Sequence, residues 1–234
     1  MRHYLIVEDN IAFAENLAEI LRDEGDDVSL ASNGPDALML AHQTHFDAVL
    51  TDMRMPSMGG AQLVHELRLI DPGIPAMVVT AYTGDDDIQF AFREGLLGVF
   101  AKPISIPILK QLLRAARRDG VVVLVEDDDT LADNLSEALR SRGLTPATVS
   151  SVLETQRLAP LQPFAAIVDL RVPGGPDGEA MQQLRARFPS LPMIAITGHQ
   201  ISPPIPPQKL FRKAFSTEAL IREIESLYAT RCEV

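Results

Sequence analysis

The chain begins its first apolar run with LIVEDN at residues 5–10, and the same pattern returns as VLVEDD at residues 123–128. Further along, AVLTD at residues 48–52 returns as AIVD at residues 166–169, with the two aspartates 117 positions apart. Self-similarity at a nearly fixed spacing indicates repeated structural units. The sequence therefore predicts a duplicated domain.

Two further landmarks keep the same order. VVT at residues 78–80 returns as AIT at residues 195–197, and FAK at residues 100–102 returns as FRK at residues 211–213. The second copy is six residues shorter between its threonine and its lysine. We expect the first domain at residues 1–118, a short linker at 119–120 and the second domain at 121–234. These copies account for the whole chain, so we expect no output domain in it.

Short β-branched runs alternate with helical patterns in the first copy. Strands are expected at residues 4–7, 28–31, 48–51, 76–80 and 98–101, and helices at residues 11–23, 35–43, 60–70, 85–94 and 106–117. Strands that are apolar on both faces and joined by helices indicate a parallel sheet covered on both sides. Each copy is therefore predicted to be a doubly wound α/β domain with strand order 2-1-3-4-5.

Composition narrows the function classes. The net charge is −11, with −8 on residues 1–120 and −3 on the rest, so neither half has the basic footprint of direct nucleic-acid binding. No apolar run is long enough to span a membrane, and Glu8-Asp9 interrupts the first one, which excludes a secretory signal. The single cysteine, Cys232, fits a reducing compartment. We expect a cytoplasmic protein without membrane contact.

Polar residues follow the strands of the first copy at their carboxyl ends: Glu8, Asp9, Asp52, Thr80 and Lys102. In parallel sheets these ends meet at one edge, which is where ligands bind. Converging carboxylates repel one another, and a hard cation such as Mg²⁺ removes that repulsion. Asp52 could then act as a nucleophile toward a phosphoryl group, with Lys102 and Thr80 contacting the phosphoryl oxygens.

With this ordered set, the chain resembles two copies of the CheY-like receiver domain of bacterial two-component response regulators, a flavodoxin-like fold. The resemblance implies that Asp52 is the phosphoacceptor and that Mg²⁺ is bound by Asp9, Asp52 and the backbone carbonyl of Arg54, with Glu8 acting through water. It also implies that phosphorylation draws Thr80 inward and buries Phe100, which changes the face formed by the fourth and fifth elements.

The second copy matches with departures. The corresponding residues are Glu126, Asp127, Asp169 and Arg171 for the acceptor and metal, and Thr197, Phe211 and Lys213 for the phosphoryl group and switch. Ala214 follows the lysine where the family prefers a proline, as in Lys102-Pro103. Four prolines at residues 203–207 exclude a regular helix, so the second copy is predicted to lack its fourth helix.

Three function classes remain open. The first is a non-enzymatic response regulator that takes phosphoryl groups from a histidine kinase or a histidine phosphotransfer protein and signals to an unidentified downstream protein. The resemblance also allows a homodimer through the first receiver. The second class is a scaffold in which the second receiver, or both, works without phosphorylation. In that case Asp169 is not a phosphorylation site. The third is a phosphatase, but Arg54 and Arg171 stand where such enzymes carry a second acid. Arg54 together with Tyr82 predicts slow loss of the phosphoryl group from Asp52.

Overall fold

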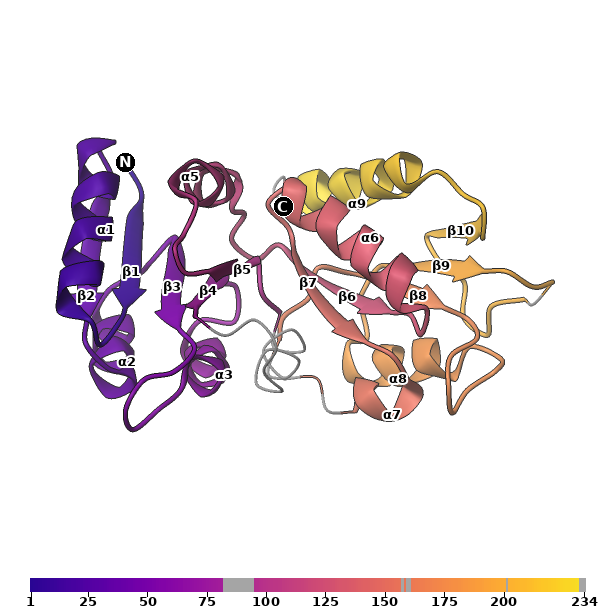
Figure 1. The fold of residues 1–234 in the computed structure, drawn as a ribbon. Coiled ribbons are helices and arrows are strands. Elements are labelled where there is room, and N and C mark those ends of the chain that lie inside the picture. The colour runs from indigo at the N-terminus through magenta and orange to yellow at the C-terminus, as the bar shows by residue number, and fades with distance from the viewer. Residues whose placement is uncertain (82–94, 157, 159–160, 201, 232–234) are drawn as a thin grey trace. The chain divides into compact units, whose positions relative to one another are not determined.

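The computed structural model describes residues 1–81, 95–156, 158, 161–200 and 202–231 (Figure 1). The chain divides into two compact units, one formed chiefly by Met1–Asp119 and the other by Gly120–Leu158 and Gln162–Val234. No helix in the described part is both long and apolar enough to cross a membrane.

The first unit contains a five-stranded, all-parallel sheet in the order β2-β1-β3-β4-β5. Its strands are β1 (His3–Val7), β2 (Asp27–Ala31), β3 (Ala48–Asp52), β4 (Ala76–Thr80) and β5 (Gly98–Ala101). Its helices are α1 (Ile11–Asp23), α2 (Gly34–Gln43), α3 (Gly60–Ile70) and α5 (Ile106–Ala115). The predicted strand order is confirmed, and the helix expected at residues 85–94 lies outside the described residues.

Alternation along the strands explains why helices cover both faces of this sheet. In β1, Leu5 and Val7 pack in a core cluster with α2 and α3, whereas Tyr4 and Ile6 pack in a second cluster with α1 and α5. Because successive side chains of a strand point to opposite faces, an uninterrupted apolar strand requires two cores. Figure 1 shows α1 and α5 on one side and α2 and α3 on the other.

Side-chain caps fix where two of these helices begin. The Asn10 side chain accepts a hydrogen bond from the Phe13 amide at 3.1 Å, and the Asn33 side chain accepts one from the Asp36 amide at 2.9 Å. Such caps satisfy backbone donors that have no partner inside the helix. They start α1 directly after the acidic end of β1, so the acidic pair stays at the carboxyl edge of the sheet.

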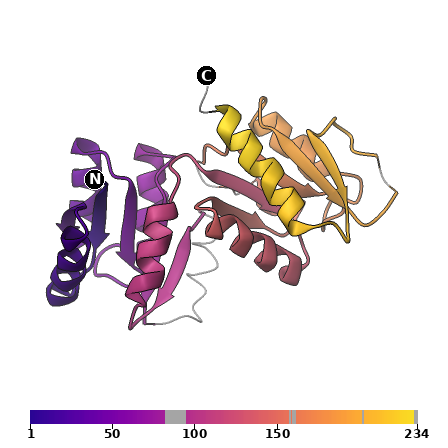
Figure 2. The ribbon, with the colours of Figure 1, turned by 90° about the horizontal axis from the view of Figure 1, so that it is seen from above.

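The second unit repeats this arrangement with the order β10-β9-β8-β6-β7, again all parallel. Its strands are β6 (Val121–Val125), β7 (Thr145–Val149), β8 (Ala165–Asp169), β9 (Met193–Thr197) and β10 (Lys209–Arg212). Its helices are α6 (Asp129–Ser141), α7 (Val152–Thr155), α8 (Glu179–Arg187) and α9 (Thr217–Arg231). Figure 2 shows α6 and α9 on the same face of this sheet. The two sheets confirm the tandem flavodoxin-like fold.

The connection between β9 and β10 departs from the first unit's plan. The described residues there, 198–200 and 202–208, contain no helix, as the four prolines predict. At β10 three of the four residues are exposed, whereas in β5 only Ala101 is. The edge of the second sheet is therefore more open to solvent than the corresponding strand of the first.

Ala214 takes the place of the expected proline after the lysine and adopts a left-handed backbone, with φ of 75°. Lys213 Nζ still lies 2.7 Å from Asp169 Oδ2, so the departure from the family pattern does not displace the lysine. A left-handed alanine costs about 1–2 kcal/mol, more than the roughly 0.5–1 kcal/mol of extra entropy that glycine loses on folding.

Replacing Ala214 by glycine should therefore stabilise the protein by about 0.5–1 kcal/mol, measured by urea unfolding. Ala229, exposed near the end of α9, is the matched control. There the same substitution should destabilise by about 1 kcal/mol, because glycine is a poor helix former. Equal signs for the two variants would contradict the account of strain at Ala214.

Candidate functional site

The first site lies at the carboxyl edge of the first sheet. The Lys102 Nζ atom lies 2.7 Å from Asp52 Oδ2, and it also donates to both carboxylate oxygens of Glu8, at 2.9 and 2.8 Å. The Lys102 amide donates to the Thr80 carbonyl at 2.9 Å, which fixes the lysine loop to the end of β4. The ammonium group of Lys102 thus binds carboxylates from two other strand ends, and the lysine backbone is bound to a third.

Burial controls the protonation of this cluster. Glu8 is buried, which raises the pKa of its carboxyl group, and the hydrogen bond from Lys102 opposes that shift only in part. Burial alone would lower the pKa of Lys102, but its hydrogen bonds to Asp52 and Glu8 outweigh burial and leave the pKa raised. Lys102 therefore stays charged and holds two carboxylates that would otherwise repel each other.

The same edge has the ligand set of a cation site. Oxygen atoms of Glu8, Asp9 and Asp52 lie within 4.8 Å of one another, and the three side chains run from buried Glu8 to exposed Asp9. The Arg54 amide donates to Asp52 Oδ1 at 3.3 Å, which brings the Arg54 backbone beside the acceptor. Oxygen-only ligands with one side open to water are what Mg²⁺ prefers. The residues present therefore fit this ion.

The two residues of the first unit that the sequence predicts to act as a switch both lie inside the protein. Thr80 is 1 % exposed and Phe100 is 8 % exposed, with Phe100 packed in the cluster that includes Leu109 and Leu113 of α5. The sequence led us to expect that phosphorylation buries Phe100. In the structure the Phe100 ring is buried against α5. Tyr82 lies outside the described residues.

Two residues near this site were missed in the sequence. Phe13 of α1 places its ring centroid 4.7 Å from Lys102 Nζ, a cation–π contact. Gly60, the first residue of α3, passes so close to the acceptor that an added Cβ would lie 2.3 Å from the Asp52 carbonyl oxygen. Gly60, at the junction of a loop and a helix, could have indicated that two backbone segments lie close together here. Nothing in the sequence distinguishes Phe13 from an ordinary core aromatic residue.

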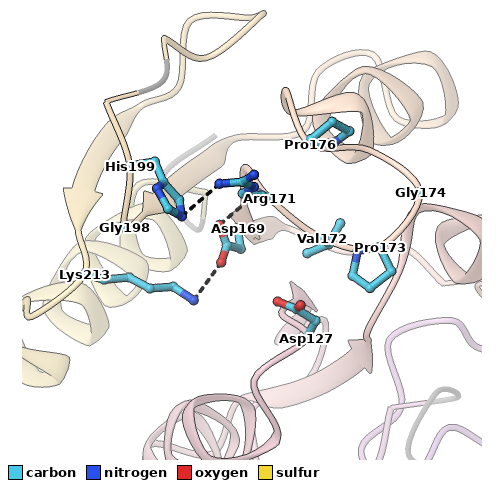
Figure 3. A pocket seen from close by; sticks show the side chains of 10 residues that line it. All are labelled: Asp127, Asp169, Arg171, Val172, Pro173, Gly174, Pro176, Gly198, His199 and Lys213. Carbon is cyan, nitrogen blue, oxygen red and sulfur yellow. Dashed lines mark hydrogen bonds and ion pairs between the residues drawn. The ribbon is translucent and has the colours of Figure 1, made fainter.

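The second site repeats this geometry, as Figure 3 shows. Lys213 Nζ lies 2.7 Å from Asp169 Oδ2 and 2.8 Å from Glu126 Oε1, and the Arg171 amide donates to Asp169 Oδ1 at 3.0 Å. A cavity of about 520 Å³ opens above Asp169 and is also lined by Asp127 and Lys213. Every predicted site residue of the second copy except Phe211 is near this cavity or beneath it.

Glu126 differs from Glu8 in the hydrogen bonding of one carboxylate oxygen. Its Oε2 is buried and has no hydrogen-bond partner among the described residues, and burial raises the pKa of its carboxyl group. Oxygens of Glu126, Asp127 and Asp169 lie within 4.8 Å of one another. An unpaired buried carboxylate oxygen beside two other carboxylates fits a divalent cation as well as the first site does. As in the first site, burial alone would lower the pKa of Lys213, but its carboxylate partners leave it raised.

The loop after Asp52 packs on the start of α2, and the loop after Asp169 packs on the start of α7. In the first unit the helix supplies the small residue of the contact, and in the second unit the loop supplies it. In the first unit, a Cβ on Gly34 would meet Met58 Sδ at 2.6 Å; in the second, a Cβ on Gly175 would meet Val152 Cγ2 at 2.6 Å. Val152 occupies the position of Gly34, and Gly175 occupies that of Met58. The large and the small partner have exchanged places while the contact is kept.

This exchange predicts a rescue. Gly34→Val alone should destabilise the protein by about 1–3 kcal/mol, because the added methyl groups enter space filled by Met58. Adding Met58→Gly, which copies the second unit, should restore part of the lost free energy of unfolding. The effects of the two substitutions should therefore differ from additivity by about 1 kcal/mol or more. Urea unfolding of the four proteins of this cycle measures it. Additive effects would mean that the two residues do not pack as described.

Comparisons with known proteins agree with this geometry. Residues 4–114 match the model of the response regulator receiver domain. The response regulator receiver protein Anae109_2439 of Anaeromyxobacter sp. (strain Fw109-5) is 59% identical over 231 residues, which are 99% of this chain and 97% of that protein. The transcriptional regulatory protein ZraR of Klebsiella oxytoca is 36% identical over 112 residues, 48% of this chain but 25% of that protein.

Among solved structures, the chemotaxis protein CheY4 of Vibrio cholerae is similar, with 30% sequence identity and a TM-score of 0.46 over 49% of this chain and 98% of that one. The family assignment does not depend on this likeness. It follows from the relative that matches nearly the full length and from the domain match in the first unit. The chain belongs to the response regulator receiver family.

Proposed function

We propose that this protein is a two-component response regulator with two receiver domains, residues 1–118 and 121–234, joined by residues 119–120. It accepts a phosphoryl group on Asp52, and on Asp169, from a phosphohistidine of a histidine kinase or a histidine phosphotransfer protein. It then signals in the cytoplasm through contacts with a downstream protein. The observation that supports this most is the lysine bound to the acceptor carboxylate in both units, at 2.7 Å each.

In the proposed transfer, an Asp52 carboxylate oxygen forms a bond to phosphorus as the phosphorus–nitrogen bond of the donor breaks. The imidazole leaves with the electron pair of that bond and takes a proton from solvent. Lys102 stabilises the negative charge that gathers on the phosphoryl oxygens, and the Thr80 hydroxyl donates to one of them. Mg²⁺, held by Asp9, Asp52, the Arg54 carbonyl and Glu8 through water, would supply further charge neutralisation.

Turnover of external phosphate esters is not part of this proposal. A phosphatase with an aspartyl-phosphate intermediate needs a general acid–base close to its nucleophile. Two residues after the acceptors stand Arg54 and Arg171, whose guanidinium groups remain charged and cannot fill that role. The aspartyl phosphate is therefore expected to act as a signal.

The test is intact-protein mass spectrometry after incubation with acetyl phosphate and Mg²⁺. The wild type should gain two phosphoryl groups, Asp52→Ala and Asp169→Ala should each gain one, and the double variant none. One addition that only Asp52→Ala removes would make the second unit a docking module. No addition to the wild type would contradict the proposal and leave the scaffold function.

A further inference from the structure

His199 connects two parts of the second site that are separate in the sequence. Its Nε2 atom lies 3.2 Å from Nη1 of Arg171, which belongs to the loop after the acceptor (Figure 3). A guanidinium group can only donate hydrogen bonds, so Arg171 is the donor and His199 Nε2 the acceptor in this exposed contact.

The backbone of His199 engages the switch hydroxyl as well. Thr197 Oγ1 accepts a hydrogen bond from the His199 amide at 3.1 Å and donates one to the His199 carbonyl at 3.3 Å. Thr197 is fully buried. One residue thus binds the hydroxyl through its backbone and the acceptor loop through its ring.

A second contact ties the following segment to the same loop. A Cβ on Gly178 would lie 2.6 Å from Cδ of Pro204, so the proline packs directly on the glycine backbone at the start of α8. The segment between β9 and β10, which replaces a helix, is therefore attached to the acceptor loop at Arg171 and at Gly178. We name the described residues 199–200 and 202–207 the proline segment.

We propose that phosphorylation of Asp169 makes Arg171 exchange His199 for the phosphoryl group and thereby releases the proline segment, which is the readout element of the second receiver. This inference rests on the proposed phosphorylation of Asp169. Arg171 and Asp169 line the same cavity of about 520 Å³, into which a phosphoryl group on Asp169 would project.

Electrostatics gives the exchange its direction. A hydrogen bond from a guanidinium to a phosphoryl oxygen joins a cation to an anion, so the attraction between two full charges adds to the hydrogen bond. The planar guanidinium can also hold two phosphoryl oxygens at once, whereas the imidazole offers one acceptor atom. The Thr197 hydroxyl moves in the same sense, because an oxygen of the phosphoryl group competes with the His199 carbonyl for its proton. The bond from Arg171 to the His199 ring and the bond from Thr197 to the His199 carbonyl then weaken together.

The test uses the full chain with Asp52→Ala, so that only the second site responds, with Mg²⁺ and beryllofluoride as the phosphoryl mimic. Fluorine NMR reports whether the mimic is bound, and hydrogen exchange with mass spectrometry reports on peptides that cover residues 198–208. Binding should speed exchange in these peptides by roughly fivefold, the effect of losing about one hydrogen bond. In His199→Ala these peptides should exchange fast before the mimic is added, and the mimic should increase their exchange rate little further.

His45→Ala in the first unit, where the side chain is 76% exposed, is the matched control and should behave like the parent. A bound-fluorine signal with unchanged exchange, or slow exchange in His199→Ala, would overturn the release of the proline segment while leaving phosphorylation of Asp169 intact. Absence of the fluorine signal would overturn both proposals.

Discussion

Replacing Lys102 by methionine should lower the free energy of unfolding by about 3 kcal/mol at pH 7 without divalent cations. Lys102 is the donor to Glu8 and Asp52, and Glu8 is only 3% exposed. Methionine keeps the length of the side chain but leaves a buried carboxylate without its counter-ion. Removing one partner of a buried charged group costs far more than removing a surface pair, because the remaining charge has lost its water as well.

Two features separate this effect from a simple loss of packing. The pKa of Glu8, already raised by burial, should rise further without the lysine, so that the loss shrinks near pH 4, where Glu8 is protonated in folded and unfolded chains alike. Mg²⁺ should restore much of the stability, because it binds the folded state and balances the same carboxylates. Urea unfolding at pH 4 and 7, with EDTA or with Mg²⁺, measures both.

Lys110→Met is the matched control. Lys110 also forms an ion pair with a glutamate, Glu24, but on the surface between α5 and the end of α1. Its loss should be much smaller and indifferent to Mg²⁺. If Lys102→Met were no more costly than Lys110→Met, or if Mg²⁺ gave no rescue, Lys102 would not be balancing a buried carboxylate pair.

Hydrophobic periodicity and the polar residues at the strand ends were enough to predict which side chains meet at the carboxyl edge of each sheet. The strands are apolar on both faces and joined by helices, so their parallel direction follows from general packing rules, whereas their order was predicted from other doubly wound folds. Because parallel strands end at one edge, the polar residues after them had to meet there. This reasoning needs only the local pattern and the repeat.

The features that it missed depend on contacts across the fold. The exchange between Gly34 and Met58 in one unit and Val152 and Gly175 in the other is visible in the aligned copies, but nothing in the sequence says that the paired positions touch. The bond between Arg171 and His199 requires two loops to approach each other.

Replacing Glu126 by glutamine should raise the stability of the metal-free protein by about 1–2 kcal/mol at pH 7. Burial raises the pKa of Glu126, so the fold favours the neutral form of this group, and glutamine is neutral at every pH. A carboxyl group with a raised pKa contributes stability below its ordinary value of 4.5, and that contribution is lost as the pH rises through the raised pKa. The gain from glutamine should therefore appear only above about pH 4.5 and grow toward neutrality.

Glu8→Gln in the first site should have the opposite sign, because the two glutamates differ in how their oxygens are bound. Both oxygens of Glu8 accept from Lys102. In Glu8→Gln the amide nitrogen replaces one of these oxygens, so one of its hydrogens would be directed at the ammonium group, which has no acceptor. In Glu126 only Oε1 accepts from Lys213, and the amide nitrogen can take the place of the unpartnered Oε2 without opposing a donor. Urea unfolding of both variants in EDTA from pH 4 to 8 gives the signs, and calorimetric titration with Mg²⁺ should show that each variant has lost one of two sites. A stability loss in Glu126→Gln would mean that the buried oxygen is paired, and the proposed cation site of the second unit would then lose the observation on which it stands.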